Sequence, residues 1–452
     1  MPSAARSAVT PLYLLACLIL GGSAQGIWQN AALQMMGLAI IAWAVIAPPA
    51  EPVSTPARRL LLIVAAGMAA VAIQAIPLPP SVWAHGAREQ IAEGYRVLGI
   101  PAPWLPIAVS PYGSLSTLLC LIPPLALFIA MVRQHAYRPS WLAAALLAGT
   151  VAGILLGVLQ VTDADTSARW YLYPQTNIGK AVGFFANPSH MGMLLIVSTP
   201  FVAAIAAAGR SRNIQHYSAL IALLVALALL VIVGVALNGS LAGFLLIGPV
   251  IGMSSLFFMD RRSKLRQPIA VLAVLGVIAA VGVIALNSSG AALINRNAGV
   301  SVQSRAEIVA TTAQATVDFL PWGSGLGSFA KVYRLYENPD VVTNEYVVHA
   351  HNDYLELVLE LGVAGGILIV LFLGWYANEV WKLWRRSTVS PFAYAASIAS
   401  AALLLHSLVE FPLRTAAMSA TFAMCLALIS DRRPPLRQEA GDLRPARHIV
   451  IR

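Results

Sequence analysis

Long apolar runs separated by short polar segments recur along the whole chain. A helix needs about 20 mostly apolar residues to cross a bilayer, because lipid offers no partner to an unpaired backbone N–H or C=O group. The pattern therefore predicts an all-α polytopic integral membrane protein with about 12 transmembrane helices. The predicted spans are residues 11–27, 31–49, 60–77, 114–132, 141–160, 189–208, 218–237, 240–259, 269–287, 354–378, 391–409 and 413–430.

The first apolar run has an alternative interpretation as a cleaved signal peptide. Arg6 precedes this run and the small residues Gly21, Gly22 and Ser23 follow it, which is the order that secretory signals use. Both interpretations place the segment in a membrane at some stage.

Composition excludes other classes of protein. Hydrophobic residues make up 58% of the 452 positions and charged residues 11%, well below the share of about 25% in soluble domains. Cys17, Cys120 and Cys425 all lie in apolar runs, which argues against a disulfide scaffold. The net charge of +10 comes from dispersed basic residues without a nucleic-acid-binding motif, so no nucleic acid is expected as a partner.

The basic residues instead predict a membrane topology. With a cytoplasmic N-terminus, the inner segments hold 20 of the 29 Lys and Arg residues, and the outer segments hold 13 of the 19 acidic residues. Short basic loops are typical of the cytoplasmic side of a membrane. Both termini are therefore predicted to be cytoplasmic.

This topology divides the chain into four parts. Residues 1–287 carry nine spans and two long outer loops near 78–113 and 161–188, and residues 288–353 form a large outer loop that contains helices. Residues 354–430 carry three further spans, and 431–452 is a basic cytoplasmic tail that is expected to face membrane lipids. Long segments on one face are where a polar substrate would be handled.

The segment His349–Glu356 lies where the largest outer loop re-enters the membrane. A neutral imidazole, here from His351, can take a proton from a sugar hydroxyl at neutral pH. A helix that starts at His351 would place Tyr354 on the same face and leave His349 pointing elsewhere. One alternative is an interfacial hydrogen-bonded collar formed by the histidines of this segment together with Asn352 and Tyr354. Another is a metal site, although residues i and i+2 of a helix do not share a face.

Arg305 is the second candidate. Ser304-Arg305-Ala306-Glu307 has the pattern of a capping box, which predicts a helix from there to about Phe319. An arginine on the first turn of a helix, beside free backbone N–H groups, suits phosphate oxygens. The alternative is a surface ion pair with Glu307 or Asp318.

The outer loop before the predicted span at 189–208 combines cations, aromatic residues and amides. Such a mixture suits recognition of sugars and phosphates, although aromatic residues also anchor helices at the interface. Asp163 and Asp165 in the same loop resemble the acidic pair with which many glycosyltransferases bind a divalent metal, but two acids at this spacing arise easily by chance. The candidate substrate-binding residues of this loop are Arg169, Lys180, Asn187 and His190, and those elsewhere in the chain are Asn352, Tyr354 and Arg414.

His406, Glu410 and Arg414 lie between the last two predicted spans. Ionisable residues at membrane depth are costly, so they indicate function by default. The alternative is a Glu410–Arg414 pair at helical i, i+4 spacing that neutralises itself.

The order of these motifs resembles the O-antigen ligase/O-antigen polymerase superfamily of bacterial envelope enzymes over about residues 180–430. The matching motifs are Gly183–His190, Ser304–Glu307, the glycine-rich turn Gly323–Phe329, His351–Leu355, Glu360–Gly365 and His406–Pro412.

The resemblance implies an inverting, metal-independent glycosyltransferase of the bacterial inner membrane, with no cofactor and its active face in the periplasm. The donor would be a glycan on undecaprenyl pyrophosphate, and the acceptor lipid A–core or a growing glycan. Arg305 would hold the pyrophosphate and His351 would activate the acceptor hydroxyl.

Family members commonly carry an arginine where Leu241 follows Asn238-Gly239-Ser240. Either Arg169, Lys180 or Arg414 then replaces it, or the activity differs. Repeat-unit polymerase, protein glycan transferase, glycan transporter and non-catalytic export component remain alternatives. The unequal loops and the polar residues gathered on one face disfavour a transporter.

Overall fold

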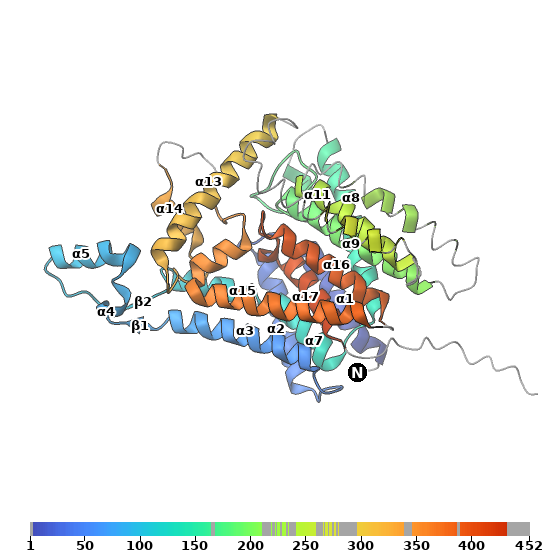
Figure 1. Cartoon of the computed structure of the whole chain (residues 1–452), viewed down its shortest axis with the longest axis horizontal. Helices are drawn as coiled ribbons and strands as arrows, with labels where there is room; N and C mark the ends of the chain where they lie inside the picture. The colour runs from blue at the N-terminus through green and yellow to red at the C-terminus, as the bar shows by residue number, and fades with distance from the viewer. Residues whose placement is uncertain are drawn as a thin grey trace, which may run out of the picture.

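The computed structural model is an all-α membrane protein (Figure 1). It describes residues 3–163, 168–209, 241–258, 296–338, 346–386 and 389–431, with scattered positions between 218 and 279. Among these residues, six helical segments are long and apolar enough to span a bilayer. They are α2 (Trp28–Ile46), α3 (Thr55–Gln74), α6 (Pro111–Leu119) together with α7 (Ile122–Gln134), α8 (Pro139–Thr162), α9 (Pro188–Gly209) and α15 (Asp353–Arg385).

Shorter apolar helices account for four further predicted spans. They are α1 (Ser3–Leu20), α11 (Leu241–Ser255), α16 (Pro391–His406) and α17 (Ala416–Ser430). Helix α1 begins eight residues before the predicted start, because the polar residues ahead of the apolar run continue the same helix. The predicted spans 218–237 and 269–287 are described only at scattered positions, so the count of twelve stays a prediction.

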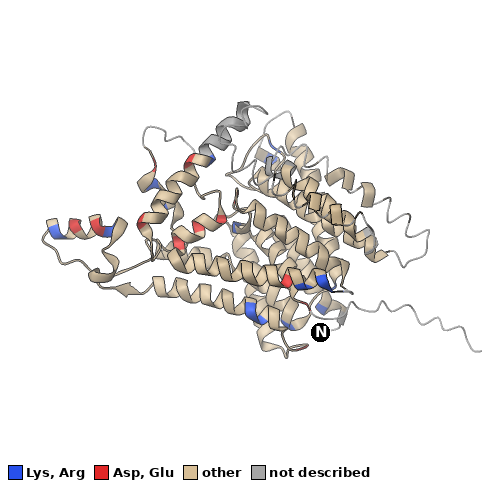
Figure 2. Ribbon diagram, viewed as in Figure 1, with Lys and Arg blue, Asp and Glu red and all other residues tan. Residues whose placement is uncertain are grey.

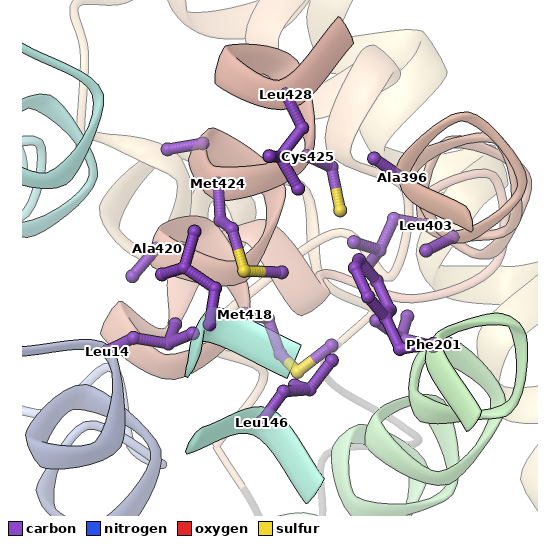
Figure 3. Packing of buried hydrophobic residues seen from close by; sticks show 14 of the residues in the cluster. Leu14, Leu146, Phe201, Ala396, Leu403, Met418, Ala420, Met424, Cys425 and Leu428 are labelled. Carbon is purple, nitrogen blue, oxygen red and sulfur yellow. The ribbon is translucent and has the colours of Figure 1, made fainter. Parts of the chain in front are cut away.

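The main core surrounds α17, whose side chains are nearly all buried. Figure 3 shows Met418, Met424 and Cys425 of this helix among Leu14 of α1, Leu146 of α8, and residues of α9 and α16. Closely packed apolar side chains of this kind hold membrane helices together, since lipid supplies little hydrophobic drive for association. Helix α17 is therefore fixed, and so is the turn that precedes it.

Basic and acidic side chains are separated along the neighbouring helices α3 and α15. Helices α3 and α15 pack side by side, and Trp375 Nε1 donates to Pro56 O at 3.1 Å. Figure 2 shows the basic start of α3 and the basic end of α15 at one end of the molecule, with the acids of early α15 at the other. This arrangement agrees with the predicted division into a basic inner and an acidic outer end.

A small hairpin projects beyond the C-terminal end of α3 (Figure 1). Strands β1 (Pro77–Leu78) and β2 (Leu105–Pro106) pair antiparallel and enclose α4 (Pro80–Trp83), a 3-10 turn (Gly86–Arg88) and α5 (Glu89–Val97). The buried Arg88 guanidinium donates to Pro106 O at 2.8 Å and also to Ile107 O, which closes the hairpin. The first long outer loop is thus folded.

Helix α13 (Arg296–Phe319) ends where the sequence predicted but begins earlier. No proline precedes Ser304, so helical hydrogen bonding extends back to Arg296, and the Ser-Arg-Ala-Glu pattern lies inside the helix. Phe319 packs with Phe329 and Val332 of α14 (Phe329–Tyr336) and with Leu359 of α15 in a second core. Arg305 is therefore not on a first turn, and the predicted contribution of free N–H groups there is wrong.

The glycine-rich turn completes a break in α15. Gly362 has φ 60°, which interrupts the helix, and the carbonyls of Leu359 and Glu360 then accept from the N–H groups of Ser324 and Gly325 at 2.9 and 2.8 Å. A Cβ on Gly362 would approach Pro321 O to 2.1 Å. The break separates the acidic first turns of α15 from its long apolar part, and glycine permits both the conformation and the close approach.

Candidate functional site

The candidate site lies where α13, the start of α15 and the turn between α16 and α17 meet. Helix α16 ends at His406, and a 3-10 turn (Pro412–Arg414) precedes the cap of α17, where Thr415 Oγ1 accepts from Met418 N. Ser407 O accepts from Asp353 N at 2.9 Å, which fixes the start of α15 against this turn. Two arginine–glutamate–histidine groups form here.

We call Arg305, Glu410 and His351 the outer triad, because its arginine and histidine side chains are partly exposed. Arg305 Nη2 donates to Glu410 Oε1 at 2.5 Å, and His351 Nδ1 lies 3.1 Å from Glu410 Oε2. The Glu410 side chain is 1% exposed, whereas those of Arg305 and His351 are 34% and 23% exposed. A buried carboxylate thus binds two partly exposed side chains, and a substrate can reach both of them.

The protonation of this triad follows from its contacts. Burial alone would raise the pKa of the Glu410 carboxyl, but the Arg305 charge and the His351 hydrogen bond outweigh burial and hold that pKa well below its usual range. An ionised carboxylate only accepts hydrogen bonds, so His351 Nδ1 carries the proton that it donates. A neutral His351 then has its lone pair on Nε2.

The inner triad consists of Arg414, Glu356 and His349. Arg414 Nη2 lies 3.3 Å from Glu356 Oε1, and His349 Nδ1 lies 2.9 Å from the same oxygen. Two more carboxylates, from Asp353 and Glu360, bind the guanidinium at 3.4 and 3.5 Å. Burial would lower the pKa of Arg414, but the carboxylates raise it, so this arginine is a permanent cation. Each nitrogen of its guanidinium contacts a carboxylate.

Phe411 lies between the two triads. Its ring centroid is 5.1 Å from that of His351, 4.4 Å from that of His349 and 5.1 Å from that of His190, which projects from α9. His190 is 2% exposed, and neither of its ring nitrogens bonds to a described residue. The predicted binding residue His190 therefore lies at the site, but it is buried against the ring of Phe411.

Three other predicted binding residues hold the backbone in place. Asn352 caps α15, and its Oδ1 accepts from the N–H groups of Tyr354 and Leu355 at 3.1 and 3.0 Å. The Tyr354 hydroxyl donates to Leu404 O at 2.9 Å, and Asn187 Oδ1 accepts from Ser189 N at 2.8 Å. Asn352 and Tyr354 thus form local hydrogen bonds of the kind that the collar alternative expects, whereas the third member of that collar, His351, bonds to the side chain of Glu410.

The cations of the loop before α9 lie apart from the triads. Arg169 forms an ion pair with Asp163 at 2.9 Å and covers the Trp170 ring. Lys180 is exposed and forms no ion pair with a described residue. Asp165 lies outside the described residues, as do Asn238, Gly239 and Ser240, and α11 begins at Leu241.

The contacts of the site differ from the sequence-based expectations in three ways. Arg305 binds Glu410, not Glu307 or Asp318. Glu410 and Arg414 do not pair, because the chain between them is a turn with Pro412 and not a helix. His349 does not point away: α15 begins only at Asp353, so both histidines precede the helix and both contact Phe411.

Sequence reasoning also missed Glu356 and Glu360 as parts of the site. Together with Asp353 they recur at spacings of three and four residues, which places all three on one helical face. Three acids on one face at the entry of an apolar helix indicate a buried cation partner. That pattern would have pointed to Arg414.

The histidines and acids do not gather around one point. His349, His351 and Asp353 turn to three different partners, namely Glu356, Glu410 and Arg414. Over the part of the chain that is described, no group of three or more His, Cys, Asp or Glu side chains is placed to hold a metal ion.

Comparison with known proteins gives one family match, over part of the chain. Residues 226–370 match the family model described as O-antigen ligase, and this segment contains Arg305, His351 and the acids of early α15 but not Glu410 or Arg414. No curated protein matches the chain. Over this segment, about a third of the chain, the match supports the resemblance to the O-antigen ligase/O-antigen polymerase superfamily.

Proposed function

We propose that the protein transfers a glycan from undecaprenyl pyrophosphate to a sugar hydroxyl, with inversion and without a metal, at the periplasmic face of the bacterial inner membrane. The observation that carries the proposal is that Arg305 and His351, both within the segment that matches the family, bind the same buried carboxylate, that of Glu410, which lies outside this segment. The acceptor is lipid A–core in a ligase or a growing glycan in a polymerase.

Arg305 is proposed to hold the pyrophosphate of the donor. Its guanidinium is a planar fork of donors, and Glu410 is the one described residue to which it is ion-paired, through Nη2. The remaining donors are available to phosphate oxygens. As the bond to the sugar breaks, negative charge grows on the leaving pyrophosphate, and a fixed cation stabilises that charge.

His351 is proposed to be the general base. Its Nδ1 is held by Glu410, so Nε2 is the free acceptor on a partly exposed ring. The acceptor hydroxyl gives its proton to Nε2 while its oxygen attacks the anomeric carbon from the side opposite the pyrophosphate. One displacement of this kind inverts the configuration.

Lys180 is proposed to replace the arginine that family members carry at the position of Leu241. Arg414 is enclosed by three carboxylates, and Arg169 is paired with Asp163. Lys180 remains exposed and forms no ion pair with a described residue, and Phe185, five positions farther along the same loop, contacts the ring of His190. Asn187, Asn352 and Tyr354 are proposed to shape the surface that the sugars contact.

A deletion strain tests this function and separates its two forms. Loss of a ligase should leave uncapped lipid A–core and accumulate lipid-linked polymer, whereas loss of a polymerase should leave single repeats. Complementation by the wild-type gene but not by a His351→Ala gene would tie the phenotype to the site. Unchanged envelope glycans in the deletion strain would contradict the proposal and favour a transporter or an export component.

A further inference from the structure

Glu410 binds two side chains through separate oxygens. Oε1 accepts from Arg305 and Oε2 contacts His351, so one negative charge is shared between the proposed donor-binding residue and the proposed base. A carboxylate that binds both cannot lose one partner without changing its hold on the other.

Burial makes this coupling strong. Glu410 is fully buried, and electrostatic interactions are less screened there than at the surface. The ionisable groups that face it are Arg305 from α13, His351 from the segment before α15, His190 from α9 and His406 from α16. Arg305 is the permanent cation among them, so it compensates most of the carboxylate charge while the site is empty.

A pyrophosphate would compete with Glu410 for Arg305. The Arg305 side chain is one-third exposed, so an incoming phosphate can reach it without opening the core. A phosphate and a carboxylate accept from the same fork of donors. Binding of the donor therefore withdraws positive charge from Glu410.

We propose that Glu410 is a positioning residue that couples donor binding to activation of the base. With the donor absent, Arg305 neutralises most of the charge of Glu410, so the carboxylate stabilises an imidazolium on His351 only weakly. With the donor bound, Arg305 turns to the pyrophosphate, and the charge of Glu410 is left to stabilise the imidazolium that forms on His351. The inference rests on the proposed function, and it adds an order of events: the base becomes strong only when a donor is in place.

The acceptor O–H bond breaks and its proton moves to His351 Nε2, while the oxygen lone pair forms a bond to the anomeric carbon. The bond from that carbon to the pyrophosphate oxygen breaks, and its electron pair leaves with undecaprenyl pyrophosphate. The imidazolium pairs with Glu410 until it returns the proton to solvent.

The test is Glu410→Gln in the purified full-length protein, with two measurements. Binding of undecaprenyl pyrophosphate should tighten about tenfold, because breaking an Arg305–carboxylate contact no longer opposes it; this corresponds to about 1.4 kcal/mol. Single-turnover transfer from the lipid-linked glycan should slow by about 10- to 100-fold, because an amide can donate to Nδ1 and so place the proton on the wrong nitrogen. A merely structural role would weaken both.

Two matched variants complete the experiment. Glu410→Asp retains the charge and should recover part of the transfer rate, and Glu356→Gln, the same change in the inner triad, should not tighten binding. Weaker or unchanged binding by Glu410→Gln, or tighter binding with a normal transfer rate, would overturn the coupling. A wild-type protein that neither binds undecaprenyl pyrophosphate nor transfers from the lipid-linked glycan would overturn the proposed function itself, a different result from a failure of Glu410→Gln alone.

Discussion

The two triads contain the same three residue types and differ in their surroundings. In the outer triad one carboxylate faces Arg305, and both Arg305 and His351 remain partly exposed. In the inner triad three carboxylates surround Arg414, whose side chain is 16% exposed. The arginine of the outer triad therefore has free hydrogen-bond donors, whereas the arginine of the inner triad has none.

This difference separates a binding group from a scaffold. An arginine saturated by buried carboxylates fixes the elements that carry them, here the start of α15 and the turn before α17. An arginine with one carboxylate partner and an open face can exchange that partner for a ligand. We therefore expect changes in the inner triad to act on stability and changes in the outer triad to act on transfer.

The largest expected effect on stability is that of Arg414→Ala. Loss of the cation leaves three carboxylates buried together, and breaking a buried ion pair costs about 3–5 kcal/mol. The variant should unfold at a much lower temperature in tryptophan fluorescence, and the deficit should shrink as the pH falls from 7.5 to 5, because protonation removes the uncompensated charge. Arg96→Ala, which breaks the exposed pair with Glu93, is the control and should leave the unfolding temperature unchanged. Equal unfolding temperatures for the two variants would refute the assignment of Arg414 to the scaffold.

Arg305→Ala should destabilise the fold less than Arg414→Ala, because it leaves one buried carboxylate without its cation and not three, and it should reduce transfer by about 10²- to 10³-fold, as the loss of one charge-stabilising donor does in other enzymes. Arg305→Lys should be nearly as slow, because an ammonium cannot form the two parallel contacts of a guanidinium. Lys180→Ala should weaken undecaprenyl pyrophosphate binding less than Arg305→Ala does. Steady-state transfer and binding in purified protein check all three, and full activity of Arg305→Lys would argue against pyrophosphate recognition.

The smallest expected effect is that of removing divalent metal. Transfer should be unchanged in chelator, and replacing Asp163 and Asp165 together should also have little effect, since Asp163 is engaged by Arg169 and Trp170. Activity lost in chelator and regained with magnesium or manganese would show that the metal-independent mechanism is wrong.

The membrane helices were the part of the fold that could be predicted most directly. Lipid forces each apolar run into a helix, so hydropathy alone located α2, α3, α8, α9 and α15 to within a few residues at most ends. The predicted start of α13 was wrong by several residues, because a capping pattern can also occur inside a helix. The helix expected to start at His351 begins two residues later, because Asn352 caps α15.

The site could be predicted only as a set of separate motifs. Arg305 and Glu410 lie 105 positions apart, and nothing local in the sequence indicates that they meet. Local spacing suggested the wrong partner for Glu410, because the i, i+4 rule assumes a helix that Pro412 and the turn around it prevent. The regular spacing of Asp353, Glu356 and Glu360 was a usable signal of a buried cation.

The two histidines give the most direct test of the central claim, that transfer takes place at the outer triad. Each binds a carboxylate through Nδ1 and each contacts Phe411, so His351→Ala and His349→Ala remove the same group from the two triads. A positioned base contributes about 10²- to 10⁴-fold. In transfer assays with purified proteins at matched expression, His351→Ala should lose activity on that scale while still binding undecaprenyl pyrophosphate, and His349→Ala should keep substantial activity. Equal activity of the two variants, or near-normal turnover by His351→Ala, would contradict the account.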